Sequence, residues 1–375
     1  SEDLAPEIEF LSPAFTRDPN YTLVYTLDGV EKRETILLAQ EKTTFVREAQ
    51  GSNGKKRTAS FTVTLLAPAT IAIQQTYQWI RNFSKQNPAS FDRLGTSVAF
   101  LGENILTGAP EDDGTGINAG AVYLFEKASG NLLKTFNNPS PVNTFRFGAS
   151  MATAGTKILI GATGGSGAVY VFDGDAASPS YGNLLRTISN PTPSVNDEFG
   201  ISLSAFGNQI LVGAPGDDTG AVNAGAAYLF DLQTGQILQT FLNPTPASED
   251  QFGRAVALTT NRALIGAKND DTDIMDAGAA YLFDTANGNL LKTYSNPDPA
   301  AGDSFGASVA FTNGNIVIGA PKDDFVHPLL TNLMWWTEDV GSVYLFNGDS
   351  QSVNFGNLLK RFNMMRRFGE FGSTV

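Results

Sequence analysis

The feature that most restricts the fold of this chain is a sequence motif, called the phrase below, that repeats at a nearly constant interval. Its opening glycine recurs at steps of 53, 52, 53 and 53 residues, at Gly95, Gly148, Gly200, Gly253 and Gly306. A Gly-Ala pair follows in every copy with the same steps, beginning at Gly108, Gly161, Gly213, Gly266 and Gly319. A fixed period of this length is typical of an array of supersecondary units that stack on one another.

Each unit contains four short apolar runs separated by Gly, Asn, Asp or Pro, which is the pattern of short β-strands. In the third unit the runs are Ile201–Phe206, Gln209–Gly213, Ala226–Asp231 and Gln236–Phe241. Four strands leave no room for a helix of ordinary length, and one such unit must bury its faces against its neighbours. The sequence therefore predicts an all-β chain with a β-propeller of four-stranded blades. A β-solenoid is the alternative, and it is disfavoured because solenoid coils are usually much shorter.

The repeated phrase also resembles a known family. Phe199-Gly200 followed by Gly213-Ala214-Pro215 resembles the FG-GAP repeat of integrin α-subunit propellers and of many bacterial surface proteins. One other copy matches in full and three change a single position; these begin at Phe305, Leu94, Phe147 and Phe252. The resemblance extends from about Phe91 to Val375. It implies a propeller and an extracellular or cell-surface setting, although a shared fold does not fix a function.

The first part of the chain does not carry the repeat. Tyr21–Leu27 alternates with period two and ends in Asp28-Gly29, and Glu34–Leu38, Thr43–Arg47 and Ala59–Leu66 are predicted as further strands. The pattern resembles a small bacterial immunoglobulin-like β-sandwich, trimmed at its start. We therefore divide the chain into an immunoglobulin-like sandwich (1–68), a linker with the last strand of an incomplete blade (69–90), five blades (91–362) and the start of a further blade (363–375).

Composition excludes several kinds of chemistry. The chain has no cysteine and a single histidine, His327, so disulfides, thiolate metal sites and sites with several histidines are excluded. The net charge of −13 disfavours a nucleic-acid partner, whose phosphates would be repelled. No apolar run is long enough to predict a membrane span. None of the common catalytic motifs is present, and the sequence predicts no enzyme.

Pairs of aspartates follow the Gly-Ala strand in four units, and three of these units have a further Asn or Asp nearby. The residues are Asp112, Asp113 and Asn118; Asp217, Asp218 and Asn223; Asp270, Asp271 and Asp276; and Asp323 and Asp324. Clustered carboxylates on a tight loop suit Ca²⁺, the one cofactor that we consider. The resemblance implies calcium in a different loop, which here is only Ala205–Asn208 and has no acid. The alternative is that the pairs cap turns, which we favour because they recur in nearly every unit.

Two other repeated positions are predicted to be structural. An aspartate stands two residues before the opening Phe or Leu in four units, at Asp92, Asp197, Asp250 and Asp303, and we expect it to accept backbone N–H hydrogen bonds of the turn. We expect the Phe itself to pack between blades. We expect the glycine after it to allow a close backbone approach or a positive φ.

Function is expected where the units differ. The fifth unit is longer, and its insertion carries Trp335 and Trp336, two adjacent aromatic residues predicted to form a binding surface or to fold back over the blade edge. We interpret the chain as a non-catalytic adhesion or ligand-binding module. Its partner would be a protein or glycan ligand at the cell surface. The alternative is a structural subunit of an extracellular filament or assembly that binds copies of itself, and a hydrolase with its site in the propeller well is disfavoured.

Overall fold

The computed structural model of the chain divides into two compact units, residues 1–80 and 81–375. In the second unit it describes residues 82–85, 87–141, 144–324 and 341–363, and in the first it describes the strands. No helix occurs among the described residues, so none of them forms a helix long and apolar enough to cross a membrane.

The first unit contains two antiparallel sheets of three strands each. Their strands are β1 (Ile8–Phe10), β2 (Asn20–Leu27) and β3 (Val30–Leu37) in one sheet, and β4 (Lys42–Gln50), β5 (Lys56–Leu66) and β6 (Thr70–Ala72) in the other. All four predicted strands of this region are found. Strand β6 lies in the stretch predicted as a linker and pairs with the end of β5. The immunoglobulin-like assignment stays a prediction.

The second unit contains five antiparallel four-stranded sheets, which we call blades 1 to 5. Blade 1 is β7 (Ser97–Leu101), β8 (Asn104–Ala109), β9 (Ala121–Phe125) and β10 (Leu132–Asn137). Blade 2 is β11 (Phe147–Ala154), β12 (Lys157–Ala162), β13 (Ala168–Asp173) and β14 (Leu184–Ser189). Blade 3 is β15 (Ser202–Phe206), β16 (Gln209–Ala214), β17 (Ala226–Asp231) and β18 (Ile237–Leu242). Blade 4 is β19 (Phe252–Leu258), β20 (Arg262–Ala267), β21 (Ala279–Asp284) and β22 (Leu290–Ser295). Blade 5 is β23 (Ser308–Thr312), β24 (Asn315–Ala320), β25 (Ser342–Phe346) and β26 (Leu358–Asn363).

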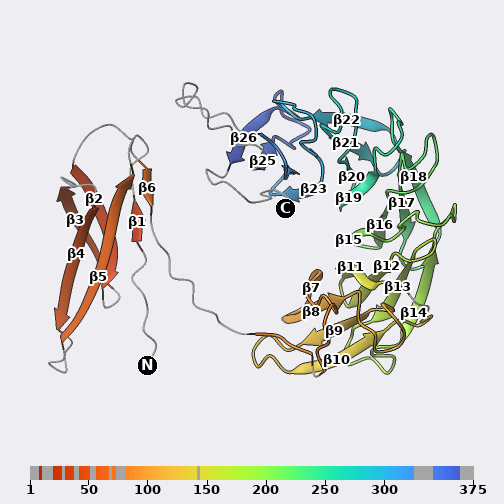
Figure 1. Cartoon of the computed structure of the whole chain (residues 1–375), viewed down its shortest axis with the longest axis horizontal. Coiled ribbons are helices and arrows are strands. Elements are labelled where there is room, and N and C mark those ends of the chain that lie inside the picture. The colour runs from red at the N-terminus through yellow and green to blue at the C-terminus, as the bar shows by residue number, and fades with distance from the viewer. Residues whose placement is uncertain are drawn as a thin grey trace. The chain divides into compact units, whose positions relative to one another are not determined.

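In every blade the strands pair in chain order, and the blades follow one another along a curved row (Figure 1). The first strands of consecutive blades contact each other, whereas the fourth strands β10, β14, β18 and β22 lie on the outer side of the row. The fold class predicted from the repeat, an all-β array of propeller blades, is confirmed. The predicted start of a further blade, residues 363–375, lies outside the described residues beyond Asn363.

The phenylalanine that opens the repeat in blades 2 to 5 fills the space between its blade and the preceding one. Phe199 is fully buried and packs with Val171 of blade 2 and with Val212 and Phe230 of its own blade. Its ring centroid lies 6.0 Å from that of Phe230, with an interplanar angle of 86°, an edge-to-face geometry. The equivalent rings of blades 2, 4 and 5 are also fully buried. The predicted packing between blades is confirmed.

Two glycines per blade allow the backbones of neighbouring blades to meet. Gly200 has a φ of 91°, a conformation that favours glycine. Gly213 has an ordinary φ, but a Cβ built on it would overlap the carbonyl oxygen of Gly253 in the next blade. That oxygen also accepts a hydrogen bond of 2.7 Å from the Ser202 hydroxyl. The prediction for the glycine after the Phe is confirmed, since Gly200 has a positive φ and a Cβ built on it would also lie 3.0 Å from the carbonyl oxygen of Ala168 in blade 2. The close approach at Gly213 is a further finding.

Candidate functional site

The first aspartate of each acidic pair is buried and anchors a tyrosine. In blade 3, Asp217 Oδ1 accepts from the backbone N–H of Thr219 at 2.9 Å, and Oδ2 accepts from the Tyr228 hydroxyl at 2.6 Å and the Thr192 hydroxyl at 2.7 Å. Burial raises the pKa of Asp217, but these donors outweigh it and hold the pKa below its usual range. The same contact joins Asp112 to Tyr123, Asp270 to Tyr281, and Asp323 to Tyr344.

In blades 1, 3 and 4 the second aspartate of the pair is exposed and caps the turn that follows. Asp218 Oδ1 accepts from the backbone N–H of Asn223 at 2.9 Å, and Asn223 has a φ of 51°, in the left-handed region that Asn and Asp tolerate. The same hydrogen bond joins Asp113 to Asn118 and Asp271 to Asp276. The predicted role of the pairs as turn caps is confirmed for these loops.

The geometry of these loops does not by itself assemble a metal centre. Among the described residues, no group of three or more His, Asp or Glu side chains is arranged to hold a metal ion. The third residue of the sets in blades 1, 3 and 4 donates its backbone N–H to the second aspartate of the pair; these residues are Asn118, Asn223 and Asp276. In blade 5, Asp323 and Asp324 are described, but the loop that follows them at residues 325–340 is not. The calcium assignment stays a prediction.

A second buried aspartate lies close to the first in blades 3, 4 and 5. Asp250 Oδ2 accepts from the Asn243 side-chain amide at 2.7 Å and from the backbone N–H of Ala247 at 2.7 Å, which confirms its predicted capping role. Its Oδ1 is buried without a hydrogen-bond partner, as are the Oδ1 atoms of Asp197 and Asp303. Burial, with a contribution from the nearby Asp270, raises the pKa of Asp250 to about 6. Burial likewise raises the pKa of Asp303 to about 6.

In blades 1 and 5, the first and last of the described blades, a cationic side chain forms an ion pair with a buried aspartate. In blade 1, Lys85 takes the position that Asn243 has in blade 4, and its Nζ lies 2.7 Å from Asp92 Oδ2 and 2.5 Å from Asp112 Oδ2. In blade 5, the guanidinium of Arg361 lies 2.9 Å from Asp323 Oδ2. Burial raises the pKa of Asp112, but the hydrogen bonds from Lys85 and Tyr123 outweigh it and hold this pKa below its usual range, whereas burial outweighs Arg361 and raises the pKa of Asp323.

Blade 2 has neither buried acid. Phe145 stands where Asp197 stands in blade 3, and Gly165 stands where Asp217 stands. A Cβ built on Gly165 would lie 3.6 Å from the Phe145 ring, so the ring covers the glycine. The two acids are therefore absent together. Sequence reasoning treated them as separate motifs, although their joint absence from one repeat is a signal that they act as a unit.

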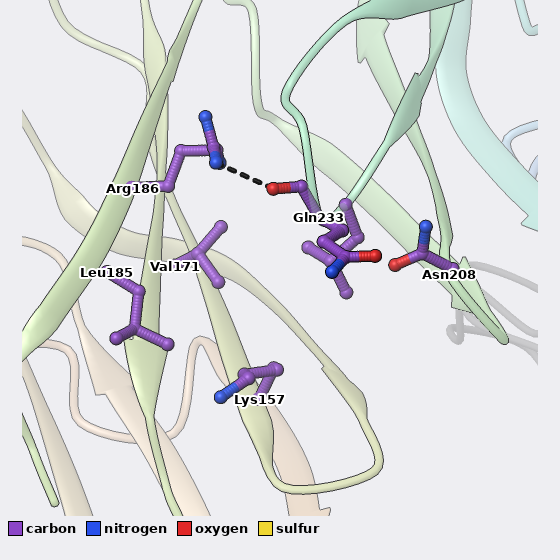
Figure 2. A pocket seen from close by; sticks show the side chains of 7 residues that line it. Lys157, Val171, Leu185, Arg186, Asn208 and Gln233 are labelled. Atoms are coloured by element: carbon purple, nitrogen blue, oxygen red, sulfur yellow. Dashed lines mark hydrogen bonds between the residues drawn. The ribbon is translucent and has the colours of Figure 1, made fainter. Parts of the chain in front are cut away.

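A pocket of about 330 Å³ lies between blades 2 and 3, on the outer side. Its residues from blade 2 are Lys157, Val171, Leu185 and Arg186, and those from blade 3 are Asn208, Leu232 and Gln233. Figure 2 shows Val171, Leu185 and Lys157 facing Gln233 and Asn208 across the pocket. The Arg186 guanidinium donates to the carbonyl oxygens of Gln233 at 2.6 Å and Thr234 at 2.7 Å. The pocket therefore combines buried apolar side chains with two cationic ones.

Sequence reasoning did not identify this pocket, because its residues come from two blades and from turns that carry no motif. The predicted binding residues Trp335 and Trp336, and His327 beside them, lie outside the described residues.

Comparisons with known proteins agree with the repeat. The family model described as "FG-GAP repeat" matches four segments, residues 84–125, 191–230, 242–283 and 295–346. The intervening blade 2, which has lost its acidic loop, is not matched. No curated protein matches the chain. The solved structure of the computationally designed Ika8 protein is 17% identical over 93% of this chain and 85% of that chain, with a TM-score of 0.45, a likeness too weak to inform function.

Proposed function

Because this chain is built from FG-GAP repeats, we propose that it is a non-catalytic binding module that acts outside the cell or at the cell surface. The proposed partner is a protein or glycan ligand. The family resemblance supports the extracellular setting, since FG-GAP repeats are typical of integrin α-subunits and of bacterial surface proteins.

The observation that carries this proposal is the contrast between the interior and the connections of the blades. The interior repeats similar contacts: a buried Phe opens blades 2 to 5, a close glycine contact recurs between consecutive blades, and a Ser hydroxyl of blades 1, 2 and 3 donates to the next blade. The connections differ: the turn between the third and fourth strands is longer in blades 2 and 5, and blade 2 lacks the acidic loop. Variable loops held by a rigid scaffold are where binding sites commonly lie.

A surface-binding assay tests this proposal. The purified chain is immobilised and presented with a panel of extracellular matrix proteins and glycans. The matched variant replaces the long turn of blade 2, residues 174–183, with the short turn of blade 4, residues 285–289. We expect a saturable signal for a panel member that is weakened in the variant. No saturable binding to any panel member would contradict the proposal.

Light scattering separates the proposal from its alternative. A binding module should be a monomer over a range of concentrations, whereas a subunit of a filament should give an open-ended size distribution.

A further inference from the structure

Two of the four blade-to-blade interfaces are sealed by an aromatic ring from the following blade. The long turns of blades 2 and 5 both end in an aromatic residue followed by Gly-Asn, at Tyr181 and Phe355. Tyr181 packs against the apolar cluster between blades 1 and 2, and Lys134 Nζ lies 4.9 Å from its ring centroid. Phe355 packs against the cluster between blades 4 and 5, and the Arg262 guanidinium lies 5.9 Å from its centroid. In both interfaces a cationic side chain contacts the ring.

The interface between blades 2 and 3 has no such ring. The turn of blade 3 that faces blade 2, Leu232–Gln236, is short and contains no aromatic residue. The place that an aromatic ring takes at the sealed interfaces corresponds here to the pocket of about 330 Å³. Val171 and Leu232 form its buried apolar wall, and the half-exposed Leu185 lies beside them.

The two cationic residues of this pocket occupy the same strand positions as two cationic residues of blade 4, one that contacts the Phe355 ring and one that contacts the adjacent Gly356. Lys157 and Arg262 are each the first residue of the second strand of their blades. Arg186 and Lys292 are each the third residue of the fourth strand. Lys292 lies against Gly356, next to Phe355, just as Arg186 lies against Gly235. Blades 2 and 4 therefore present the same pair of cationic positions, and only blade 4 has a ring of the chain itself beside it.

The cations of the pocket differ in how firmly they are held. Arg186 is fixed by its two hydrogen bonds to the carbonyl oxygens of blade 3, so its guanidinium plane is preorganised (Figure 2). Lys157 is half-exposed, and its Nζ lies 3.7 Å from Asp173 Oδ1, a long ion pair that leaves the ammonium free to turn toward a ligand.

We propose that this pocket between blades 2 and 3 binds an aromatic side chain presented by a partner polypeptide, in the place that Tyr181 takes between blades 1 and 2 and Phe355 takes between blades 4 and 5. The ring would bury its edge against Val171, Leu185 and Leu232, and Lys157 and Arg186 would contact its face. This inference rests on the proposed binding function and names the ligand chemistry of one site.

Ligand-observed NMR on the full chain tests the site. The probe is N-acetyl-tyrosine amide, with N-acetyl-leucine amide as the apolar control. A single ring with few contacts should bind with a Kd roughly in the millimolar range. The matched variant, Lys157→Gln with Arg186→Gln, gives blade 2 the residues that blade 3 has at these positions, Gln209 and Gln239. We expect at least a fivefold weaker affinity for the tyrosine probe in this variant, and no saturable binding of the leucine probe to either protein.

Other outcomes would overturn the proposal. Equal affinity of the variant and the unchanged protein for the tyrosine probe would show that the ring binds elsewhere. Binding of inorganic phosphate without binding of the tyrosine probe would make the two cations an anion site.

A grafted turn provides a second test, and one of its two readouts, the Tm, needs no ligand. Leu232–Gln236 is replaced by the long turn of blade 2, residues 174–183, which brings its own tyrosine. We expect the grafted ring to raise the Tm and to abolish binding of the tyrosine probe. The same graft with serine in place of its tyrosine controls for the loss of Leu232 and of the carbonyls of Gln233 and Thr234, and its Tm should be lower than that of the tyrosine graft. Failure of both experiments, with panel binding retained in the surface assay, would contradict this site and leave the binding-module proposal standing.

Discussion

Blades 2 and 3 place the same kinds of side chain in their interiors but have different loops. Phe147 and Phe199 are both fully buried at the interface with the preceding blade, and Gly148 and Gly200 have the same φ of 91°. In the loops, blade 2 has Phe145 and Gly165 where blade 3 has two buried aspartates, and its third-to-fourth-strand turn is longer. The difference teaches that interior positions in contact with the next backbone keep the same residue types, whereas the neighbouring loop residues differ together as a set.

The largest expected effect tests the shared interior. Phe199→Ala should lower the free energy of unfolding by about 3–5 kcal/mol, because it removes a fully buried ring from a close-packed interface. Phe147→Ala should cost as much if the two interiors are equivalent. Phe206→Ala is the control, since that side chain is 48% exposed and should change stability by less than about 1 kcal/mol. Denaturant unfolding measures all three, and an unchanged midpoint for Phe199→Ala would contradict the packing argument.

The second prediction tests the loops, where the blades differ. Tyr228→Phe removes a hydrogen bond to the buried carboxylate of Asp217, and should cost about 1–3 kcal/mol. Tyr170→Phe, at the same position in blade 2, removes only a hydrogen bond to the neutral Ser140 and should cost about 0.5–1.5 kcal/mol. Chemical denaturation gives both values. Equal losses would mean that the buried acid adds nothing to blade 3.

The third prediction concerns pH and applies only to blades with an unpaired buried acid. The pKa of Asp250 is raised to about 6 in the folded state, so the folded chain binds this proton more tightly than the unfolded chain, where the pKa is about 4. Its contribution to stability is therefore full below about pH 4 and is lost as pH rises to about 6, with a slope of up to about 1.4 kcal/mol per pH unit. Asp250→Asn should flatten this part of the stability profile.

The matched control for this experiment is Asp218→Asn, which changes an exposed acid of the same type. Unfolding free energies measured between pH 4 and pH 7 should fall more steeply for this control than for Asp250→Asn. Parallel profiles for the two variants would show that Asp250 does not titrate in this range.

The smallest effect is expected from calcium. If the acid pairs of blades 1, 3 and 4 serve as turn caps, the Tm in millimolar Ca²⁺ should equal the Tm in chelator, with Mg²⁺ as the control ion. A ligand that binds only the folded state would raise the Tm by mass action. A rise specific to Ca²⁺ that disappears stepwise as the pairs are changed to Asn would instead establish the calcium sites.

Much of the scaffold could be predicted from the repeat alone. The strand ends in blade 3 differ from the predicted ones by no more than one residue, because alternation and turn residues are local signals. The buried Phe199 and the positive φ of Gly200 also followed from a position that recurs in every copy. The proximity of Asp250 to Asp270 could not be predicted in this way, because the two acids lie on different connections and come close only when the blade folds.

The sequence by itself therefore determined the number of complete blades among the described residues, the extent of their strands and the side chains that face their interfaces, since each of these depends on a pattern within one repeat. Only the tertiary structure decided which loops of successive blades come together. The pocket between blades 2 and 3 is an example. Lys157 and Gln233 are far apart in the chain, and their approach depends on how closely two blades stack and on how short the turn of the second one is.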